Sequence, residues 1–399
     1  MSSDSLEDLK RRVCDAVDQL SETLLHVSHT VHANPELAFE EHEACNLLVS
    51  TLEAAGLEVE PGAYGLETAF AADFGEKRED NACVALVAEY DALPEIGHAC
   101  GHNIIATASV GAGLALQTLG DRLPGCIRIL GTPAEERGGG KELMARKGAF
   151  EGIDAAMMIH PAGVNLVDMP SIAVSDVEVT YKGVAAHASA MPERGRNALD
   201  GLVFAYQAIG ALRQHIRPSE RIHGIITDGG QAPNIVPERA VGRFFVRARN
   251  EKELEPLKER VVGCFRAGAE ATGTEVQLNW SSVDYLAIRF NAPLAASFQK
   301  NAESLGRDFV PIDQLSSRFA GSTDMGNVSH RVPSIHPMIA AAPPHCTIHN
   351  AEFAVHAGAE IGDAAALDGA KALAMTALDF LSDPDLRERT RNIFEDFSE

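Results

Sequence analysis

Hydrophobic residues recur along the chain in two different patterns, and the first pattern extends to about residue 170. There, segments with helical spacing alternate with short, continuous apolar runs. Residues 6–57 have helical spacing that is broken at Asn34-Pro35, which predicts two N-terminal helices. An alanine-rich helix near residues 104–119 would connect the first two apolar runs. The runs have the length and composition of strands buried on both faces of a mostly parallel α/β sheet, and they span residues 82–90, 126–132 and 155–161.

After Pro170 the pattern changes to an alternation of apolar and polar residues, which is typical of strands with one buried face. The expected elements form a β-α-β-β-α-β series at residues 175–183, 198–215, 221–230, 240–250, 251–273 and 275–285. This series is the split arrangement of a ferredoxin-like α+β unit. From Asn291 the first pattern, of helices and short apolar runs, resumes, and it ends in a long helix at residues 358–381. We therefore predict one domain from residues 1–171 and 289–399, with a second domain, residues 172–288, inserted in it.

Composition narrows the classes of function. A length of 399 residues exceeds the usual size of a single hydrophobic core, which agrees with two domains. The formal charge of -23 argues against nucleic acid or an anionic membrane as a partner, because phosphates would be repelled. The N-terminal segment shows no basic, apolar leader and no membrane-spanning stretch, so we expect a cytoplasmic protein. The seven cysteines are an odd number scattered along the chain, and we interpret them as reduced thiols.

Residues that can bind metal cluster where the apolar runs end. HACGHN, residues 98–103, and PAEE, residues 133–136, follow the first two runs. His160 closes the third run, and IHN, residues 348–350, lies near the C-terminus. Because binding residues of open α/β sheets gather at the carboxyl ends of strands, we expect these segments to meet. Together they offer a thiol, imidazoles and carboxylates, which are the donors that a pair of divalent metal ions needs. The sequence therefore predicts a metal-dependent hydrolase.

Two of these segments contain adjacent or nearly adjacent donors. Cys100 and His102 flank a glycine, so their side chains can converge, although a C-x-H pair alone is equally compatible with a buried thiol beside loop histidines. Glu135 and Glu136 follow a buried run, where a solvated face is not expected. One glutamate can bind metal while the other takes a proton from the attacking water. We assign Glu136 as the ligand and Glu135 as the general base, and the spacing is equally compatible with the reverse.

His160 and His349 are weaker candidates when taken alone. A single histidine on an apolar strand is more often a satisfied core residue than a ligand. His345 and His356 compete with His349 for the same role. The case for His160 and His349 therefore depends on the other clusters.

Five further residues are considered for supporting roles. Asp91, or Glu89 instead, could accept the second ring N–H of a ligand histidine. Arg247 lies in the apolar strand FFVRA, where a buried guanidinium needs an anion such as a substrate carboxylate. His187 and Asn234 lie in turns, where such residues usually have no special function.

The combination of motifs resembles the dinuclear metallopeptidases of the aminoacylase and carboxypeptidase family. The resemblance covers nearly the whole chain, and its segments in order are PELAFEEHEA, EYDALPEIGHACGHN, GTPAEERGGG, the His160 segment, GVAAHAS with GRNAL, GGQAPNIVP, GSTDMGNVSHRVPSIHP and IHNAEF. It is similar to the amidohydrolase branch that contains hippurate and auxin-conjugate hydrolases, p-aminobenzoyl-glutamate hydrolase and β-alanyl dipeptidases. The resemblance implies an N-acyl amino acid or dipeptide as substrate. It also implies that residues 172–288 form a lid that makes the protein a homodimer.

The same resemblance implies roles for single residues. The ligands of two divalent ions, Zn²⁺ first and Mn²⁺ or Co²⁺ as alternatives, would be Cys100, His102, Glu136, His160 and His349. Glu135 matches the catalytic base. His187 matches the residue that stabilises the tetrahedral oxyanion, often across the dimer interface. Asn234 and Arg247 match positions that hold the substrate carboxylate.

The chain departs from the commonest form of the branch at two places. Asn103 stands where aspartate is usual, and Glu89-Tyr90 replaces an Asp-Met pair. Both changes leave the ligands intact and affect the residues around them. The segment GSTDMGNVSHRVPSIHP is more similar to the dipeptidase and p-aminobenzoyl-glutamate subgroup than to the hippurate one.

Two other functions are compatible with parts of the sequence. Cys100 could be a nucleophile activated by His98 or His102, as in thiol amidases. A thiol amidase, however, has no use for Glu136 or the two distant histidines. The second alternative is a non-catalytic peptide-binding protein on the same scaffold.

Overall fold

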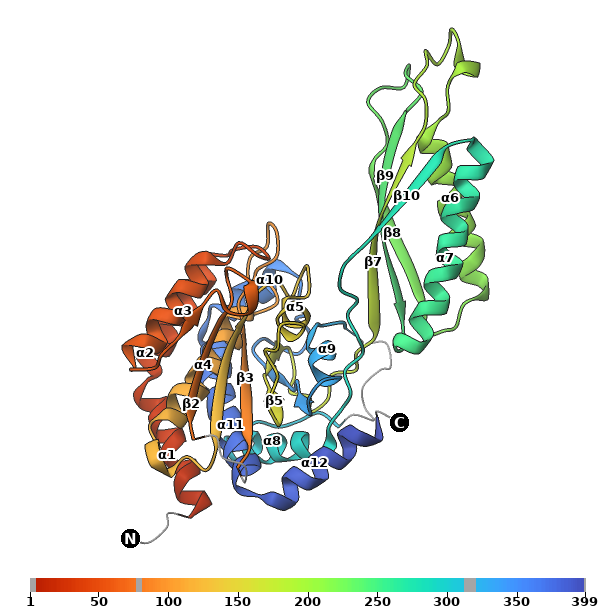
Figure 1. Ribbon diagram of the computed structural model, residues 1–399. Coiled ribbons are helices and arrows are strands. Elements are labelled where there is room, and N and C mark those ends of the chain that lie inside the picture. The colour runs from red at the N-terminus through yellow and green to blue at the C-terminus, as the bar shows by residue number, and fades with distance from the viewer. Residues whose placement is uncertain (1–4, 77–80, 312–320, 398–399) are drawn as a thin grey trace. The chain divides into compact units, whose positions relative to one another are not determined.

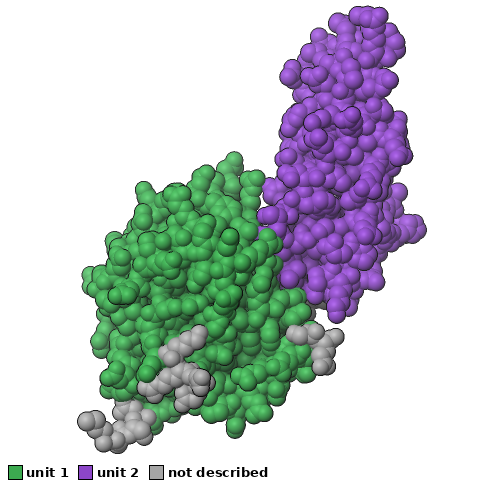
Figure 2. Space-filling view, viewed as in Figure 1, with its two compact units in different colours: residues 1–170, 288–399 green, residues 171–287 purple. Residues whose placement is uncertain are grey.

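The computed structural model describes residues 5–76, 81–311 and 321–397 (Figure 1). The chain divides into two compact units, coloured separately in Figure 2. Unit 1 consists of residues 1–170 and 288–399, and unit 2 consists of residues 171–287. Unit 2 is thus one continuous stretch within the sequence of unit 1.

Unit 1 is built on a six-stranded sheet in the order β1-β2-β4-β3-β5-β11. Neighbours among β4, β3, β5 and β11 are parallel, while β2 is antiparallel to both β1 and β4. A separate parallel pair joins β6 to β12. The predicted class, α/β with a mostly parallel sheet, is confirmed. The strands are β1 Glu60–Pro61, β2 Phe70–Gly75, β3 Cys83–Glu89, β4 Cys126–Thr132, β5 Ala155–Met157, β6 His160–Ala162, β11 Ser334–Ile335 and β12 Met338–Ala340.

Helices cover both faces of this sheet, so its central strand is apolar on both sides. In β3, Val84 and Leu86 belong to one buried cluster, and Ala85 and Val87 belong to the other. This explains why the strand reads as a continuous apolar run. The helices of unit 1 are α1 Leu6–Gln19, α2 Ser21–Ala33, α3 His42–Ala54, α4 His102–Gln117, α5 Gly140–Ala145, α8 Ala292–Ser304, α9 Met325–Ser329, α10 Ala351–Ala357, α11 Glu360–Ser382 and α12 Pro384–Asp396. No helix among these or elsewhere in the described residues is long and apolar enough to cross a membrane.

Several predicted boundaries in unit 1 are wrong. Residues 6–57 form three helices, because α1 and α2 are separated at Leu20. The backbone of Leu20 stays in the right-handed region (φ -87°, ψ -1°), and no glycine or proline marks the boundary. The run at residues 155–161 forms two strands, β5 and β6. Both strands follow one segment in the same register, since Met158 N bonds to Ile335 O and His160 N bonds to Pro337 O, whereas the pairing of β5 with β3 ends at Met157. Strand β2 and helix α12 were not predicted.

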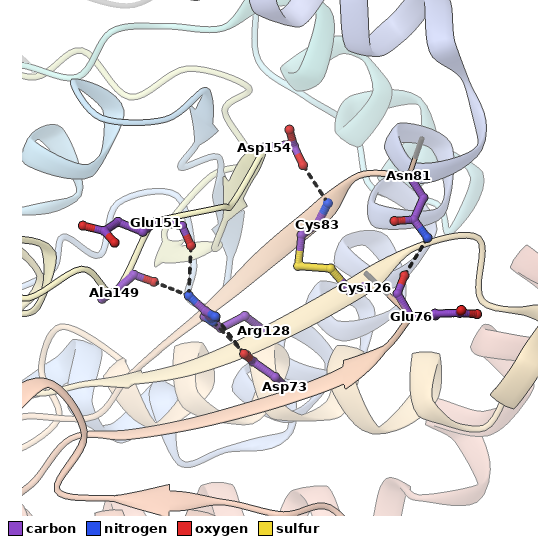
Figure 3. Close-up of a disulfide and its surroundings, with 9 residues drawn as sticks. All are labelled: Asp73, Glu76, Asn81, Cys83, Cys126, Arg128, Ala149, Glu151 and Asp154. Carbon is purple, nitrogen blue, oxygen red and sulfur yellow. Dashed lines mark hydrogen bonds and ion pairs between the residues drawn. A yellow bond between two sulfur atoms is a disulfide. The ribbon is translucent and has the colours of Figure 1, made fainter. Parts of the chain in front are cut away.

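The expectation that all cysteines are reduced thiols is wrong for one pair, because Cys83 and Cys126 form a disulfide (Figure 3). They are register partners at the beginning of the adjacent strands β3 and β4, and their Cα atoms are 4.5 Å apart. That separation suits a disulfide. The backbone N–H of Cys83 also donates to Asp154 Oδ2 at 2.8 Å. The remaining five cysteines are free. The cytoplasmic location stays a prediction.

Unit 2 has the predicted β-α-β-β-α-β order around a four-stranded sheet, β10-β7-β9-β8. Every neighbouring pair is antiparallel. The two helices pack on one face, where Phe244 and Val246 meet Leu202 and Phe265 in a buried cluster. The elements are β7 Ala173–Lys182, α6 Ala198–Leu212, β8 Arg221–Asp228, β9 Arg239–Ala248, α7 Glu251–Thr272 and β10 Glu275–Trp280.

Candidate metal centre

The HACGHN segment connects β3 to α4 and turns sharply at Gly101, whose φ is 76°. A Cβ on Gly101 would lie 2.9 Å from Pro161 and 3.3 Å from Phe353. Glycine is therefore required by both the left-handed backbone and the available space. The turn places Cys100 and His102 on either side of it, and their exposed fractions are only 5% and 0%.

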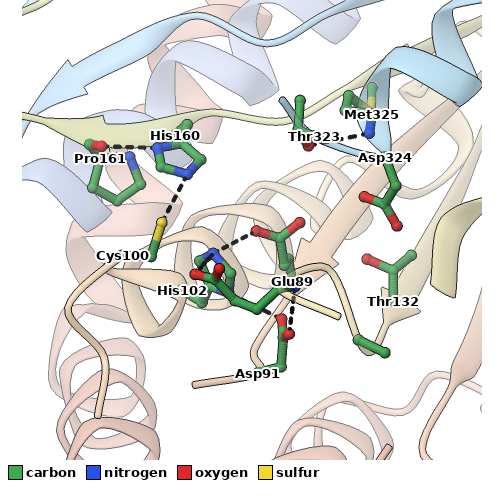
Figure 4. A network of polar contacts seen from close by, with 12 residues as sticks. Glu89, Asp91, Cys100, His102, Thr132, His160, Pro161, Thr323, Asp324 and Met325 are labelled. Carbon is green, nitrogen blue, oxygen red and sulfur yellow. Dashed lines mark hydrogen bonds and ion pairs between the residues drawn. The ribbon is translucent and has the colours of Figure 1, made fainter. Parts of the chain in front are cut away.

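All five predicted metal ligands lie in one cluster, arranged as two groups of three. Cys100 forms one group with His102 and His160 and a second group with Glu136 and His349. The Sγ atom of Cys100 is 3.4 Å from His160 Nε2 and 3.3 Å from His349 Nε2. His349 Nε2 is 3.4 Å from Glu136 Oε1. Figure 4 shows the thiol facing the ring of His160. The thiol is thus the only ligand atom common to the two groups.

The donors in this cluster fit a pair of divalent cations. Three buried polar atoms of the cluster have no hydrogen-bond partner among the described residues, and each can offer a lone pair: Glu89 Oε1, His102 Nε2 and Glu136 Oε1. Buried polar atoms without partners are costly, and a cation would compensate them. Thiolate, imidazole and carboxylate are also the usual ligand types for zinc and its neighbours.

Asp91 orients His102 from the side away from the cluster. His102 Nδ1 is 3.0 Å from Asp91 Oδ1, and Asp91 Oδ2 accepts the backbone N–H of Glu136 at 2.8 Å. A histidine whose Nδ1 is held in this way presents Nε2 to a metal. Glu89, the alternative left open by the sequence, lies instead on the Nε2 side, at 2.9 Å. The geometry therefore separates the two carboxylates that the sequence could not distinguish.

The two adjacent glutamates reach different parts of the cluster. Glu136 faces Cys100 and His349, whereas Glu135 groups with Glu89 and His102. Burial raises the pKa of Glu135 well above its ordinary value, and the charges of Glu89 and Glu136 raise it further. Burial also opposes ionisation of Glu136, but His349 and His102 outweigh it and lower the pKa of that carboxyl. One glutamate thus tends to hold a proton while its neighbour is ionised.

Glu41, which was not singled out as a site residue, supports the turn that precedes this glutamate pair. Its carboxylate is fully buried and accepts the backbone N–H groups of Ala134 and Phe39 at 2.8 and 2.9 Å, and the hydroxyl of Thr68 at 2.8 Å. Ala134 has a left-handed φ of 62°, which costs energy for a residue with a Cβ. Burial raises the pKa of Glu41 to about 7. The only sequence signal was its place in PELAFEEHEA.

Replacing Glu41 by alanine is expected to lower the free energy of unfolding by about 2 to 4 kcal/mol, because buried donors lose their shared acceptor. Denaturant titration at pH 8, where the carboxyl is ionised, measures the change. The matched control is Glu40→Ala, whose side chain is exposed and which should change stability by less than about 0.5 kcal/mol. Equal losses in the two variants would contradict this role for Glu41.

Sequence reasoning also missed a buried ion-pair network beside the cluster. Lys141, at the start of α5, contacts Glu89 and lies 2.7 Å from Asp324 Oδ1, and all three side chains are fully buried. Asp324 and Glu89 raise the pKa of Lys141 although burial opposes its charge. Burial raises the pKa of Asp324 to about 6 in spite of Lys141. No local pattern could reveal this network, since its members are 52 and 183 residues apart.

Two of the predicted substrate-contacting residues lie on paired loops of unit 2. The backbone N–H of Ala188, next to His187, donates to the carbonyl oxygen of Asn234 at 3.0 Å. His187 is exposed, and its Nδ1 accepts the backbone N–H groups of Ser189 and Ala190 at 3.3 Å. Because Nδ1 acts as an acceptor, the proton of the neutral ring resides on Nε2. His187 therefore presents an exposed N–H donor.

Arg247 lies at the other end of the same sheet. It pairs with Val174, whereas Arg239, beside the two loops, pairs with Lys182. Eight residues of strand separate these positions, which is about 26 Å. The guanidinium is half-buried on the face away from the helices, where Nε contacts His223 Nε2 at 3.2 Å and the group stacks on Phe245. Within one chain, Arg247 is therefore not brought together with His187 and Asn234.

Known proteins share both the sequence pattern and the fold. The pattern of Peptidase family M20/M25/M40 matches residues 85–378. The chain is 41% identical over 406 residues to the Xaa-Arg dipeptidase of Mus musculus, covering 99% of this chain and 94% of that protein. It is 26% identical over 456 residues to one of the subunits of the p-aminobenzoyl-glutamate hydrolase of Escherichia coli (strain K12), covering 96% of this chain and 94% of that protein.

A solved structure has a similar fold. The YXEP protein of Bacillus subtilis, described as a dinuclear metal binding peptidase from the M20 family, superposes with a TM-score of 0.65 at 20% identity. The likeness covers 91% of this chain and 99% of that one. The family predicted from the motifs is confirmed. Because the family pattern spans most of the chain and a relative matches it almost end to end, the chain belongs to Peptidase family M20/M25/M40 and is a metal-dependent hydrolase of amide bonds.

Proposed function

We propose that this hydrolase uses two divalent cations to cleave dipeptides, with a preference for a basic C-terminal residue. The observation that supports two cations is the position of Cys100, whose sulfur is common to both ligand groups. A thiolate can bridge two cations, and no other residue belongs to both of these ligand groups. Support for the substrate comes from the 41% identity to an Xaa-Arg dipeptidase. The net charge of -23 would also attract a cationic substrate.

One cation would be held by Cys100, His102 and His160, and the other by Cys100, Glu136 and His349. When bound, the ions would supply Lewis acidity, polarising the scissile carbonyl and making a water molecule acidic near neutral pH. Zn²⁺ is our first choice because sulfur and imidazole nitrogen predominate, with Mn²⁺ or Co²⁺ as alternatives.

Glu135 would act as the general base. It takes a proton from the attacking water and delivers it to the leaving amine, so its carboxyl must hold a proton between the two steps. Burial and the neighbouring carboxylates, which raise its pKa, favour that protonated state. Glu136, whose pKa is lowered, would remain an ionised ligand. Environments that separate the pKa values of two adjacent carboxyls are typical of acid–base sites.

His187 would stabilise the oxyanion of the tetrahedral intermediate through its exposed Nε2–H. Asn234, on the paired loop, and Arg247 would hold the substrate carboxylate. A dipeptide spans only about 7 Å, so one substrate cannot contact His187 and Arg247 of the same chain across about 26 Å of sheet. We therefore propose a homodimer in which His187 and Asn234 act in the site of the partner subunit.

The surface of unit 2 offers an apolar area for such a dimer. Strand β8 lies at the edge of its sheet and exposes 64% of Ile225. On α6, Val203 and Phe204 are 38% and 46% exposed. Edge strands and exposed apolar side chains are common features of protein interfaces.

Subunit mixing tests the contribution of His187 across the interface. The Glu135→Gln and His187→Ala variants should each be inactive, yet a hybrid dimer would contain one site with both residues intact. Random mixing after mild denaturation should restore about a quarter of the wild-type activity, since half of the dimers are hybrids with one working site. Absence of recovery in dimers shown to be hybrid would mean that His187 acts in its own chain.

A substrate panel with metal-loaded enzyme tests the preference. We expect kcat/KM for Xaa-Arg dipeptides to exceed that for matched Xaa-Glu dipeptides by at least about tenfold, which corresponds to about 1.4 kcal/mol of transition-state binding. N-acyl amino acids should be intermediate. A higher kcat/KM for p-aminobenzoyl-glutamate than for any dipeptide would contradict the proposal.

The thiol amidase alternative is disfavoured by the surroundings of Cys100. Burial and the charge of Glu136 raise the pKa of its thiol well above the ordinary value, although His102 opposes them. A nucleophilic cysteine needs the opposite shift. Next to two cations, the same thiol would be held as a thiolate ligand.

A further inference from the structure

We propose that Glu89 is a further metal ligand, which binds the cation beside His102. This inference rests on the two-cation function proposed above and adds a donor to it. Glu89 is the last residue of β3, and its side chain is fully buried. The sequence suggested for it only an outer role, as an alternative to Asp91.

The contact between Glu89 and His102 has the geometry of two ligands of one ion. Glu89 Oε1 is 2.9 Å from His102 Nε2, and apart from this contact neither atom has a hydrogen-bond partner among the described residues. Two donor atoms at about 2.0 to 2.2 Å from the same cation lie about 2.8 to 3.6 Å apart, for angles at the ion from about 90° to the tetrahedral value, and the observed distance lies within this range. Asp91 already occupies Nδ1 of the same ring, so Nε2 is the atom that is free to bind metal. Figure 4 shows Glu89 and His102 facing each other beside Cys100.

Lys141 orients the carboxylate of Glu89. Its ammonium group contacts Glu89 Oε2, which leaves Oε1 directed at His102. Asp324 holds Lys141 in turn, through the ammonium at 2.7 Å and through the backbone N–H of Lys141 at 2.9 Å. A ligand carboxylate whose second oxygen is fixed by a neighbouring group is a common arrangement in metal sites.

The charges of this network favour a nearby cation. Glu89 and Asp324 are two carboxylates and Lys141 is one ammonium, so when all are ionised the fully buried network carries a net charge of -1. An uncompensated charge without access to water is strongly unfavourable. A divalent ion at Oε1 of Glu89 would neutralise the excess. The ion pair with Lys141 alone cannot do so, because Asp324 shares the same ammonium.

The added carboxylate would make the two metal positions different. The ion beside His102 would have sulfur, two imidazoles and a carboxylate from the protein, and the other would have sulfur, one imidazole and one carboxylate. The higher number of protein donors raises the affinity of the first position. We therefore expect Glu89 to determine binding at one position only.

Equilibrium dialysis against Co²⁺, with elemental analysis, tests this inference without any measurement of activity. Wild-type protein should bind two ions per chain. Glu89→Gln, which keeps the shape of the side chain, should weaken one of them by about 10- to 100-fold and leave the other unchanged. The visible Co²⁺ absorption bands of that position should change, while the sulfur-to-cobalt charge-transfer band of Cys100 should persist.

The matched control is Glu142→Gln. Glu142 follows Lys141 in α5, but its carboxylate pairs with Arg331 and Arg146 at 2.8 Å, outside the ligand groups. This variant should bind two ions as the wild type does. Wild-type affinity and absorption at both positions in folded Glu89→Gln would overturn the inference and leave the two-cation function standing. Fewer than two ions in the wild type would instead overturn that function itself.

A second measurement uses the wild-type protein and so does not depend on the folding of the variant. In crystals soaked with Co²⁺, the anomalous peak beside His102 should lie within about 2.5 Å of Glu89 Oε1. A peak more than about 3.5 Å from that oxygen would overturn the assignment of Glu89 as a ligand.

Discussion

Replacing Glu135 by glutamine is expected to lower kcat by about 10²- to 10⁴-fold, the usual contribution of a general base, while both cations stay bound. Glutamine has nearly the same shape, but it cannot take a proton from water or deliver one to the leaving amine. Because Glu135 reaches the Glu89 and His102 side of the cluster rather than the group of Glu136, it can be lost without removing a predicted ligand.

Steady-state kinetics on metal-loaded protein measure the fall in kcat. Elemental analysis of the same sample measures how many cations stay bound. The Glu142→Gln variant is the control, since its carboxylate pairs with Arg331 and Arg146 outside the cluster, and it should keep wild-type turnover. A variant at Glu135 with normal turnover would remove this residue from the mechanism. Loss of one cation in that variant would show that Glu135 is a ligand, which is the reverse assignment that the spacing left open.

Replacing Cys100 by alanine is expected to prevent tight binding of both cations, whereas His349→Ala should weaken only one. The sulfur of Cys100 belongs to both ligand groups, and His349 belongs to one. Elemental analysis after dialysis should therefore give about none and about one ion per chain for the two variants. Activity should fall to background in Cys100→Ala. Aspartate at this position should recover part of both binding and activity, because a carboxylate can also bridge two cations.

The thiol amidase alternative predicts a different outcome for the same variants. If Cys100 were a nucleophile, Cys100→Ala would lose activity but keep its cations, and aspartate could not replace the thiol. Two ions in Cys100→Ala would therefore contradict the shared-ligand assignment.

The positions of the ligand segments could be predicted from the sequence because buried parallel strands read as continuous apolar runs. The runs that became β3 and β4 ended where expected, and the segments after them contain Cys100, His102, Glu135 and Glu136. The predicted boundaries of helices and strands were wrong where no local residue marks the end of an element. Helix α1 is separated from α2 only by Leu20, which stays in the right-handed region, and the run at residues 155–161 divides where its pairing with β3 ends at Met157.

Contacts between distant residues could not be read from the sequence. Glu41 accepts the N–H of a residue 93 positions away, and Lys141 meets Asp324 across 183 positions. Cys83 and Cys126 become neighbours only through the register of two strands. For Arg247, the sequence located the strand, but it could not reveal that about 26 Å of sheet separates this residue from Arg239, beside the loop of His187.

The central claim is that two cations share Cys100, and anomalous diffraction from crystals of metal-loaded protein tests it most directly. The account predicts two peaks in each chain. One should contact Cys100, His102 and His160, and the other should contact Cys100, Glu136 and His349. A single peak, or two peaks that do not share the sulfur of Cys100, would contradict the account.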